Sequence, residues 1–123
     1  MTTQEIANRL VELNKVQDHQ TAYAELYTDD VVSIENWGER EEFKGMDAIK
    51  EKGEKWEAMV EEIHDVQVGE PIVADKSFAV TFSMDVTFND SQGPEMAGRM
   101  QFTEIAVYRV NDDGKIYHEE FIN

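Results

Sequence analysis

Apolar residues recur at helical spacing in the first half of the chain and at every second position in the second half. Ile6, Leu10 and Leu13 lie three or four residues apart, which is typical of an amphipathic helix, and Thr3 is a suitable cap for its start. The same spacing, with a cap at Asp18, predicts a second helix. The pattern thus predicts helices from Thr3 onward, over residues 18–27 and over residues 47–60.

Alternation takes over after Glu61. In the stretch 77–88, the apolar residues Phe78, Val80, Phe82, Met84, Val86 and Phe88 alternate with mostly polar ones, so one face of this strand is apolar. Turn-forming residues separate four such stretches, which predicts an antiparallel meander of strands over 63–72, 77–88, 95–110 and 115–122. A short strand, Val31 to Glu35, precedes the third helix. Helices followed by a long antiparallel sheet indicate the α+β class.

Composition narrows the class of partner. The chain has 123 residues, 41% of them hydrophobic, and a formal net charge of −16. That length fits one domain, residues 1–123. The charge argues against nucleic acid and against anionic membranes, because both bind proteins through basic residues. We therefore expect no nucleic acid and no membrane among its partners.

Several kinds of site are excluded or disfavoured by residue type. The chain has no cysteine, so neither a disulfide nor a thiolate ligand can form. The residues His19, His64 and His118 are too far apart in sequence to form a paired ligand motif, and no phosphate-binding loop is present. We expect no metal and no cofactor. The N-terminus lacks a signal-peptide pattern, from which we expect a soluble, cytoplasmic protein.

Two pairs of segments carry a family resemblance. The first is LYTDDV at 26–31 followed by GMDAI at 45–49, and the second is VYRV at 107–110 followed by GKI at 114–116. In this order the chain resembles the SnoaL-like and ketosteroid isomerase-like branch of the nuclear transport factor 2-like superfamily, over nearly its whole length. The resemblance implies an α+β fold in which a cone-shaped, curved antiparallel sheet wraps around three helices. It also implies a homodimer formed through the sheet.

The resemblance implies a catalytic carboxylate at the end of the first strand, where this chain has Glu35. In isomerase-like relatives the residue at that place shuttles a proton. Beside an apolar wall such as Trp37, a carboxylate loses solvation, and its pKa rises toward the range of a general base. An exposed glutamate at the end of a strand is the alternative interpretation.

The third long strand departs from the family pattern. The position at which relatives carry an acid is Ala106 here, while Glu104 lies two residues earlier and therefore on the same face. The opposite row, with Ile105 and Val107, is equally apolar, so the strand could also face the other way. We favour the orientation that points Glu104 inward, since the second row then forms a dimer surface.

The last strand and the first helix depart as well. Glu119 takes the place of the cyclase histidine, Phe121 replaces the aspartate, and Tyr117 is expected on the same face as both. No tyrosine occupies the first-helix position that donates to an enolate in the isomerase, although Tyr23 or Tyr27 could substitute. Three carboxylates in one interior would require a cationic partner, for which we expect a bound ligand or Arg99.

Together these features predict a protein that binds a small hydrophobic molecule in the cone. Glu35, Glu104 and Glu119 are the candidate catalytic residues for a cofactor-free proton transfer of isomerase, dehydratase or cyclase type. The expected ligand-binding residues are Tyr23, Trp37, Trp56, Phe78, Phe82, Met84, Phe102, Tyr117 and Phe121. The alternative is a non-catalytic binding or dimerisation module with a filled interior. A cavity of about 300 Å³ or more lined by Glu35 would favour the first interpretation, whereas a filled interior would rule it out.

Overall fold

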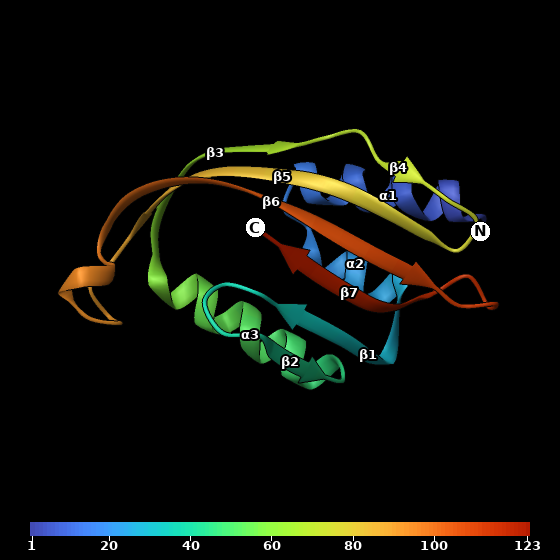
Figure 1. Cartoon of the computed structure of the whole chain (residues 1–123), viewed down its shortest axis with the longest axis horizontal. Helices are drawn as coiled ribbons and strands as arrows, with labels where there is room; N and C mark the ends of the chain where they lie inside the picture. The colour runs from blue at the N-terminus through green and yellow to red at the C-terminus, as the bar shows by residue number, and fades with distance from the viewer.

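The computed structural model describes residues 1–123. Three α-helices and one 3-10 turn combine with seven strands in a curved, unclosed sheet (Figure 1). In chain order the elements are α1 Thr3–Lys15, α2 His19–Leu26, β1 Tyr27–Glu35, β2 Glu41–Lys44, α3 Met46–Met59, β3 Val60–Val68, β4 Ile72–Val73, β5 Ser77–Phe88, η1 Pro94–Met96, β6 Gly98–Val110 and β7 Ile116–Ile122. The predicted α+β class is confirmed.

Local hydrogen bonds explain where the first two helices begin. The Thr2 side chain accepts from the backbone N–H of Glu5, and the Glu5 carboxylate accepts from the backbone N–H of Thr2, which forms a capping box. The cap of α1 is therefore Thr2, one residue before the predicted Thr3. At α2 the predicted cap is confirmed, because the Asp18 carboxylate accepts from the backbone N–H of Thr21.

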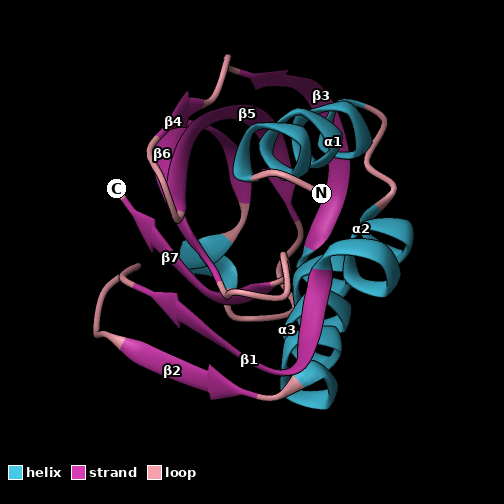
Figure 2. Cartoon of the chain, turned by 90° about the vertical axis from the view of Figure 1, so that its right-hand side faces the viewer, coloured by secondary structure: helices cyan, strands magenta, loops and turns pink.

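The sheet is mostly antiparallel, and its strand order is β2-β1-β7-β6-β5-β3, with β4 added beside β5. The one parallel pair is β1 with β7. In the view of Figure 2 the strands curve around an interior, and the three helices lie on the side that the sheet leaves open. Helix α1 packs against β3, β4 and β5, whereas α3 packs against β1 and β2 and also contacts the start of the sheet's other edge, β3.

The observed strands differ from the expected ones in their bounds and in one additional strand. β1 begins at Tyr27, directly after α2, so Asp29 and Asp30 lie in the strand instead of ending a helix. β2 was not expected from its charged sequence, and it forms by pairing with β1. The predicted strand 63–72 is split into β3 and β4. The strand expected from residue 95 begins at Gly98, because η1 occupies Pro94–Met96.

Burial establishes which face of the long strands looks inward. On β6, Ala106 is completely buried and Tyr108 nearly so. Ile105, the residue between Glu104 and Ala106, is 44% exposed. The inner row of β6 therefore contains Glu104, as expected. The core joins this row to α1, α2 and β5, and its most buried large side chains are Ile6, Leu10, Leu26, Val31, Ile49, Val80, Tyr108 and Ile116.

The longest helix has 14 residues, and none of the helices is both long and apolar enough for a membrane span.

Candidate active site

Register across the sheet places the candidate residues in neighbouring rows of the inner face. Ser33 of β1 lies opposite Glu119 of β7, which lies opposite Tyr108 of β6. One row along, Glu35 is paired with Phe121, which is paired with Ala106. Glu104 lies two residues further along β6, opposite Phe82. The strands thus bring three glutamates from distant parts of the chain to one region of the interior.

Glu35 lies beside a lysine that the sequence analysis did not identify. Lys52 of α3 donates from its Nζ to Ser33 Oγ at 2.7 Å and to Glu35 Oε2 at 3.3 Å. Burial raises the pKa of Glu35, although the positive charge and hydrogen bond of Lys52 act in the opposite direction. The side chains of Glu35 and Lys52 are 28% and 20% exposed, so both remain accessible from outside.

Helical spacing explains why Lys52 points inward. It lies three residues after Ile49 and four before Trp56, which places it on the same helical face as these two residues. Its Nζ lies 4.8 Å from the ring centroid of Phe121 and 5.3 Å from that of Phe43. The sequence signal that could have identified Lys52 is its position within the apolar face of α3, between Ile49 and Trp56.

Glu104 is the most perturbed carboxyl of the group. Burial in the first place, and the charge of Glu35 in the second, raise the pKa of Glu104 to about 7, while the ammonium of Lys52 opposes this rise. Strand register places the two residues near each other on the inner face, because Glu35 lies opposite Phe121, whose partner Ala106 is two residues after Glu104. Near neutral pH Glu104 is present in both protonated and ionised forms, and it can therefore give or accept a proton.

Glu119 has a structural partner instead of a cation. It is 3% exposed, and its Oε2 accepts a hydrogen bond of 2.7 Å from the Tyr27 hydroxyl. The ring of Tyr23 contacts Tyr27 edge-on with the centroids 5.2 Å apart. Burial, followed by the charges of Glu119 and Glu35, raises the pKa of the Tyr23 hydroxyl, which keeps it protonated.

Aromatic side chains gather beside the carboxyls. Phe102, on the same face of β6 as Glu104, packs against Trp37 at 5.5 Å and against Trp56 at 6.3 Å between ring centroids. Trp56 also packs against Phe88 at 5.4 Å. Trp37 lies on the connection between β1 and β2 and is 47% exposed, so it forms the outer side of this cluster.

The remaining expected wall residues are divided between core and surface. Phe78 stacks on Tyr108 with centroids 4.8 Å apart, and with Phe82 it belongs to the buried core. Met84 lies opposite Phe102 on the inner face. Tyr117 does not share the face of Glu119, because a bulge in β7 pairs His118 with Arg109 but Ile116 with Val110 and leaves Tyr117 unpaired and 41% exposed.

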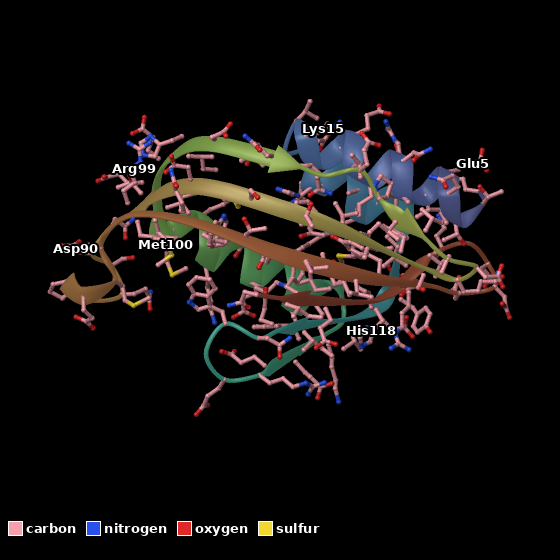
Figure 3. The ribbon with its side chains drawn as sticks, turned by 45° about the horizontal axis from the view of Figure 1, so that its top comes forward. Glu5, Lys15, Asp90, Arg99, Met100 and His118 are labelled. Carbon is pink, nitrogen blue, oxygen red and sulfur yellow. The ribbon has the colours of Figure 1, made fainter.

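The expectation that Arg99 pairs with the inner carboxylates is wrong. Arg99 follows Gly98 on the outward row of β6, and its guanidinium binds Asp85 of β5 at 2.9 and 2.7 Å. Figure 3 shows Arg99 near Met100 and Asp90 at the far end of the sheet, well away from His118. Lys52 supplies the positive charge instead.

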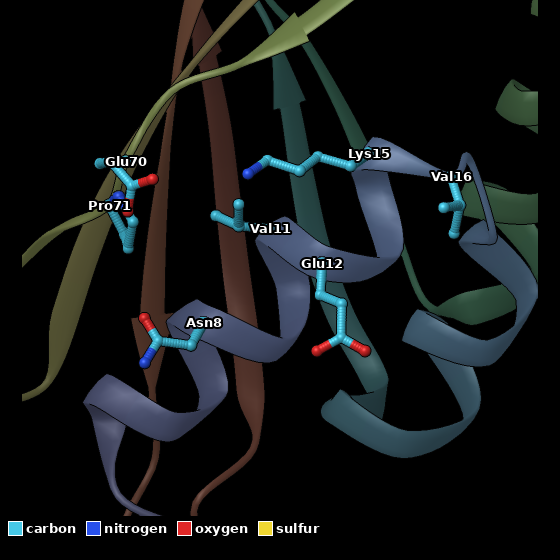
Figure 4. Close-up of a pocket in the computed structure, with 7 residues that line it drawn as sticks. All are labelled: Asn8, Val11, Glu12, Lys15, Val16, Glu70 and Pro71. Atoms are coloured by element: carbon cyan, nitrogen blue, oxygen red, sulfur yellow. The ribbon is translucent and has the colours of Figure 1, made fainter.

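Two hollows lie outside the acidic cluster. One, of about 370 Å³, is a surface groove between α1 and the β3–β4 connection, where Asn8, Val11 and Lys15 face Glu70 and Pro71 (Figure 4). The other, of about 210 Å³, is lined by Gln17, His19, Trp56, Glu57, Val60 and Ile63. Glu35 lines neither of them. Trp56, part of the aromatic cluster, borders the second of them.

The donor set of the site suits proton transfer better than metal binding. No group of three or more histidines and carboxylates is arranged to hold a metal ion. The site instead combines a carboxylate beside an ammonium, a carboxyl that titrates near neutrality and a buried tyrosine–glutamate pair. Two carboxyls in different surroundings are the usual basis for an acid and a base in one site.

Comparison with known structures gives relatives of the same fold. A proposed SnoaL-like polyketide cyclase from Mesorhizobium loti, also described as a carbohydrate phosphatase, is 30% identical, with a TM-score of 0.85 and complete coverage of both chains. A proposed polyketide cyclase from Pseudomonas putida is 22% identical, with a TM-score of 0.72, over 100% of this chain and 92% of that one. An NTF2-like protein of unknown function from Burkholderia pseudomallei is 16% identical, with a TM-score of 0.74 and the same coverages.

A comparison with curated protein sequences gives no match. The family model of the SnoaL-like domain matches residues 1–123, the entire sequence. Glu35 is the last residue of β1, the place at which the resemblance expects a carboxylate, whereas Glu104 lies two residues before Ala106, the family's acid position. The chain belongs to the SnoaL-like domain family.

Proposed function

We propose that this protein binds a small, largely apolar molecule at the acidic cluster and catalyses a cofactor-free proton transfer on it. The observation that carries the proposal is the convergence of Glu35, Glu104 and Lys52 beside an aromatic cluster on the inner face of the sheet. A family whose relatives include proposed polyketide cyclases supports a cyclase or isomerase type of reaction.

Glu35 is the proposed base. Its carboxylate takes a proton from a carbon next to a carbonyl group, and the electron pair of the broken C–H bond moves into the enolate. Glu104 in its protonated form gives a proton to the enolate, at the same or another atom. The proton held by Glu35 then passes to Glu104 through solvent, which restores both carboxyls and leaves the isomerised or exchanged ligand as the only product. Glu119 is held by Tyr27, so we assign it a supporting electrostatic role.

The ligand reaches the carboxyls past Trp37. This side chain lies on the β1–β2 connection and covers Phe102, and displacement of its indole would open the side of the cluster next to Glu35. The aromatic residues Trp56, Phe88 and Phe102 would then contact the apolar part of the ligand. Neither of the two hollows is lined by Glu35, an observation that favours the alternative, a non-catalytic module with a filled interior.

Phosphate ester hydrolysis, by contrast, fits the site poorly. A phosphate group carries negative charge, and Lys52, the lysine of this site, already pairs with Glu35 and interacts electrostatically with Glu104. The repulsion between like charges in a partly buried site opposes such a ligand. The electrostatics therefore favour a neutral substrate.

The outer face of the sheet is the surface that we propose for a homodimer. Ile105 and Ile122 lie side by side in register on β6 and β7, and each is 44% exposed. Burial of this pair against a second copy would remove apolar area from water. The expected species in solution is therefore twice the mass of the chain.

The proposed reaction is tested with 2-tetralone, an apolar bicyclic ketone, incubated with the protein in D₂O. Proton NMR should show loss of the α-proton signals faster with the wild type than with buffer alone. Glu35→Gln keeps the size of the side chain but removes the base, and we expect a loss of at least about 100-fold of the catalysed rate. Glu42→Gln, on the exposed side of β2, is the matched control and should behave like the wild type.

Exchange by Glu35→Gln at the wild-type rate would remove Glu35 as the base. Absence of exchange with any form of the protein, together with binding of 2-tetralone, would favour the non-catalytic binding module.

A further inference from the structure

The ammonium of Lys52 has a hydrogen-bonding capacity that the protein does not fully use. A lysine ammonium carries three N–H donors, and Lys52 places one on Ser33 Oγ and one on Glu35 Oε2. The rings of Phe43 and Phe121 lie close to the same nitrogen but offer no oxygen acceptor. The third donor is therefore free for an oxygen atom of a ligand.

The position of this donor relative to the carboxylate matches one chemical unit. Lys52 Nζ and Glu35 Oε2 lie 3.3 Å apart, side by side at the same site. In a ketone the carbonyl oxygen and the α-carbon are separated by about 2.4 Å, from standard bond lengths. A ligand with its carbonyl oxygen on Lys52 thus brings its α-carbon next to the Glu35 carboxylate.

The surroundings hold Lys52 in this orientation. Ser33 is completely buried and accepts the shorter of the two hydrogen bonds, at 2.7 Å, while the face of the Phe121 ring lies 4.8 Å away. A cation over an aromatic face gains electrostatic stabilisation. A fixed donor stabilises negative charge that develops on a carbonyl oxygen without the cost of reorganising at the moment of reaction.

We propose that Lys52 is the electrophilic catalytic residue of this site, and that it selects ligands with a carbonyl oxygen next to an ionisable C–H bond. Lys52 donates to the carbonyl oxygen while Glu35 removes the α-proton, and the enolate oxygen that forms stays bound to the ammonium. This inference rests on the proposed function. Lys52 would take the place of the tyrosine that donates to the enolate in the isomerase, because the corresponding first-helix residues, Arg9 and Leu10, are not tyrosines.

The test compares two probes of the same bicyclic skeleton, 2-tetralone and tetralin, which lacks the oxygen. Binding is followed by the quenching of tryptophan fluorescence, with Trp37 and Trp56 as reporters. Lys52→Met retains the length of the side chain but removes the donor. We expect it to weaken 2-tetralone roughly tenfold to a hundredfold, the range for a hydrogen bond to a charged group, and to change tetralin by less than about twofold.

Two further variants separate recognition from general damage. Lys52→Arg keeps a cationic donor and should retain the preference for the ketone. Lys55→Met changes an exposed lysine of the same helix and should bind both probes like the wild type. Equal weakening of both probes by Lys52→Met, or no weakening of either, would overturn the proposal.

A second measurement needs no variant. In the wild-type protein, the ¹⁵N signal of the Lys52 ammonium should shift much more on addition of 2-tetralone, which accepts its hydrogen bond, than on addition of tetralin, which acts on it only through its ring. An equal response to both probes would contradict the proposed contact. A ketone-specific response without deuterium exchange would retain Lys52 as the recognition group and reject only the proposed reaction, so the two failures can be told apart.

Discussion

At the scale of single residues, three glutamates of the same interior have different surroundings. Glu119 accepts a hydrogen bond from Tyr27, and Glu35 lies beside Lys52. The perturbation of Glu104 is due to burial and to neighbouring charges, and no hydrogen bond stabilises its ionised form. Three identical side chains thus have different hydrogen-bond partners and electrostatic surroundings, and the different roles that we propose for them rest on this difference.

This difference makes the stability of the protein depend on pH. The pKa of Glu104 is raised in the folded state, so between about 4.5 and about 7 the folded protein keeps a proton that the unfolded chain has lost. The free energy of unfolding therefore falls as the pH rises through this window, and the penalty is constant above it. Glu35, Glu119 and Lys52 are the charged groups that face Glu104 and set this window.

Glu104→Gln is neutral at every pH and should escape the penalty. Urea unfolding should show that its stability relative to the wild type increases by on the order of 2 kcal/mol between about pH 4 and about pH 8. Glu61→Gln, on the exposed start of β3, should follow the wild type over the same range. Parallel pH profiles of Glu104→Gln and the wild type would contradict a raised pKa.

At the scale of elements, the sequence predicted those whose pattern is local. The three helices and the long strand 77–88 follow from spacing and alternation over their own residues, and β5 has the expected bounds. β2 was missed because its charged residues carry no strand pattern, and its existence depends on pairing with β1. The bulge at Tyr117 was missed for the same reason, since it depends on the register with β6.

The two glycines of α3, Gly45 before its first turn and Gly53 inside it, differ in whether the backbone requires glycine. Gly45 precedes the helix with a φ of +89°, a conformation that is strained for other residues, while the nearest atom to an added Cβ, the Asp29 carbonyl oxygen, is at an ordinary 3.8 Å. Gly53 lies inside the helix with open space around it. The first is required by backbone geometry, and the second is not.

Alanine at these two positions should therefore shift stability in opposite directions. In urea unfolding we expect Gly45→Ala to lower the free energy of unfolding by about 1 kcal/mol or more, through backbone strain alone. Gly53→Ala should raise it by about 1 kcal/mol, because alanine favours the helix. Destabilisation by both changes would show that Gly53 is also held by a contact.

At the scale of the whole molecule, the site is produced by the curvature of the sheet and the helix that covers one half of it. The inward positions of Glu35, Glu104 and Glu119 could be predicted, because strand parity and the family resemblance are readable from sequence. Lys52 could not be assigned in the same way. It lies 17 residues from Glu35, and only the packing of α3 on β1 brings the two together.

In a chain with a large excess of negative charge, Lys52 is the positive charge of the inner site. The chain carries a formal charge of −16, yet the inner site pairs a cation with carboxyls that are partly removed from water. Outside that site, acidic residues keep the surface solvated and repel anionic partners. The position of Lys52, and not the net charge, therefore sets the local charge beside Glu35.

The electrostatic coupling of this site is tested most directly by carbon NMR of the glutamate carboxyl groups as a function of pH. One carboxyl signal, absent from Glu104→Gln, should titrate at a pH of about 7. Its pKa should rise further in Lys52→Met, because the ammonium that opposes the shift is removed. If instead every glutamate of the wild type titrates together near the ordinary value of about 4.3, the three carboxyls do not share a desolvated site, and the account is contradicted.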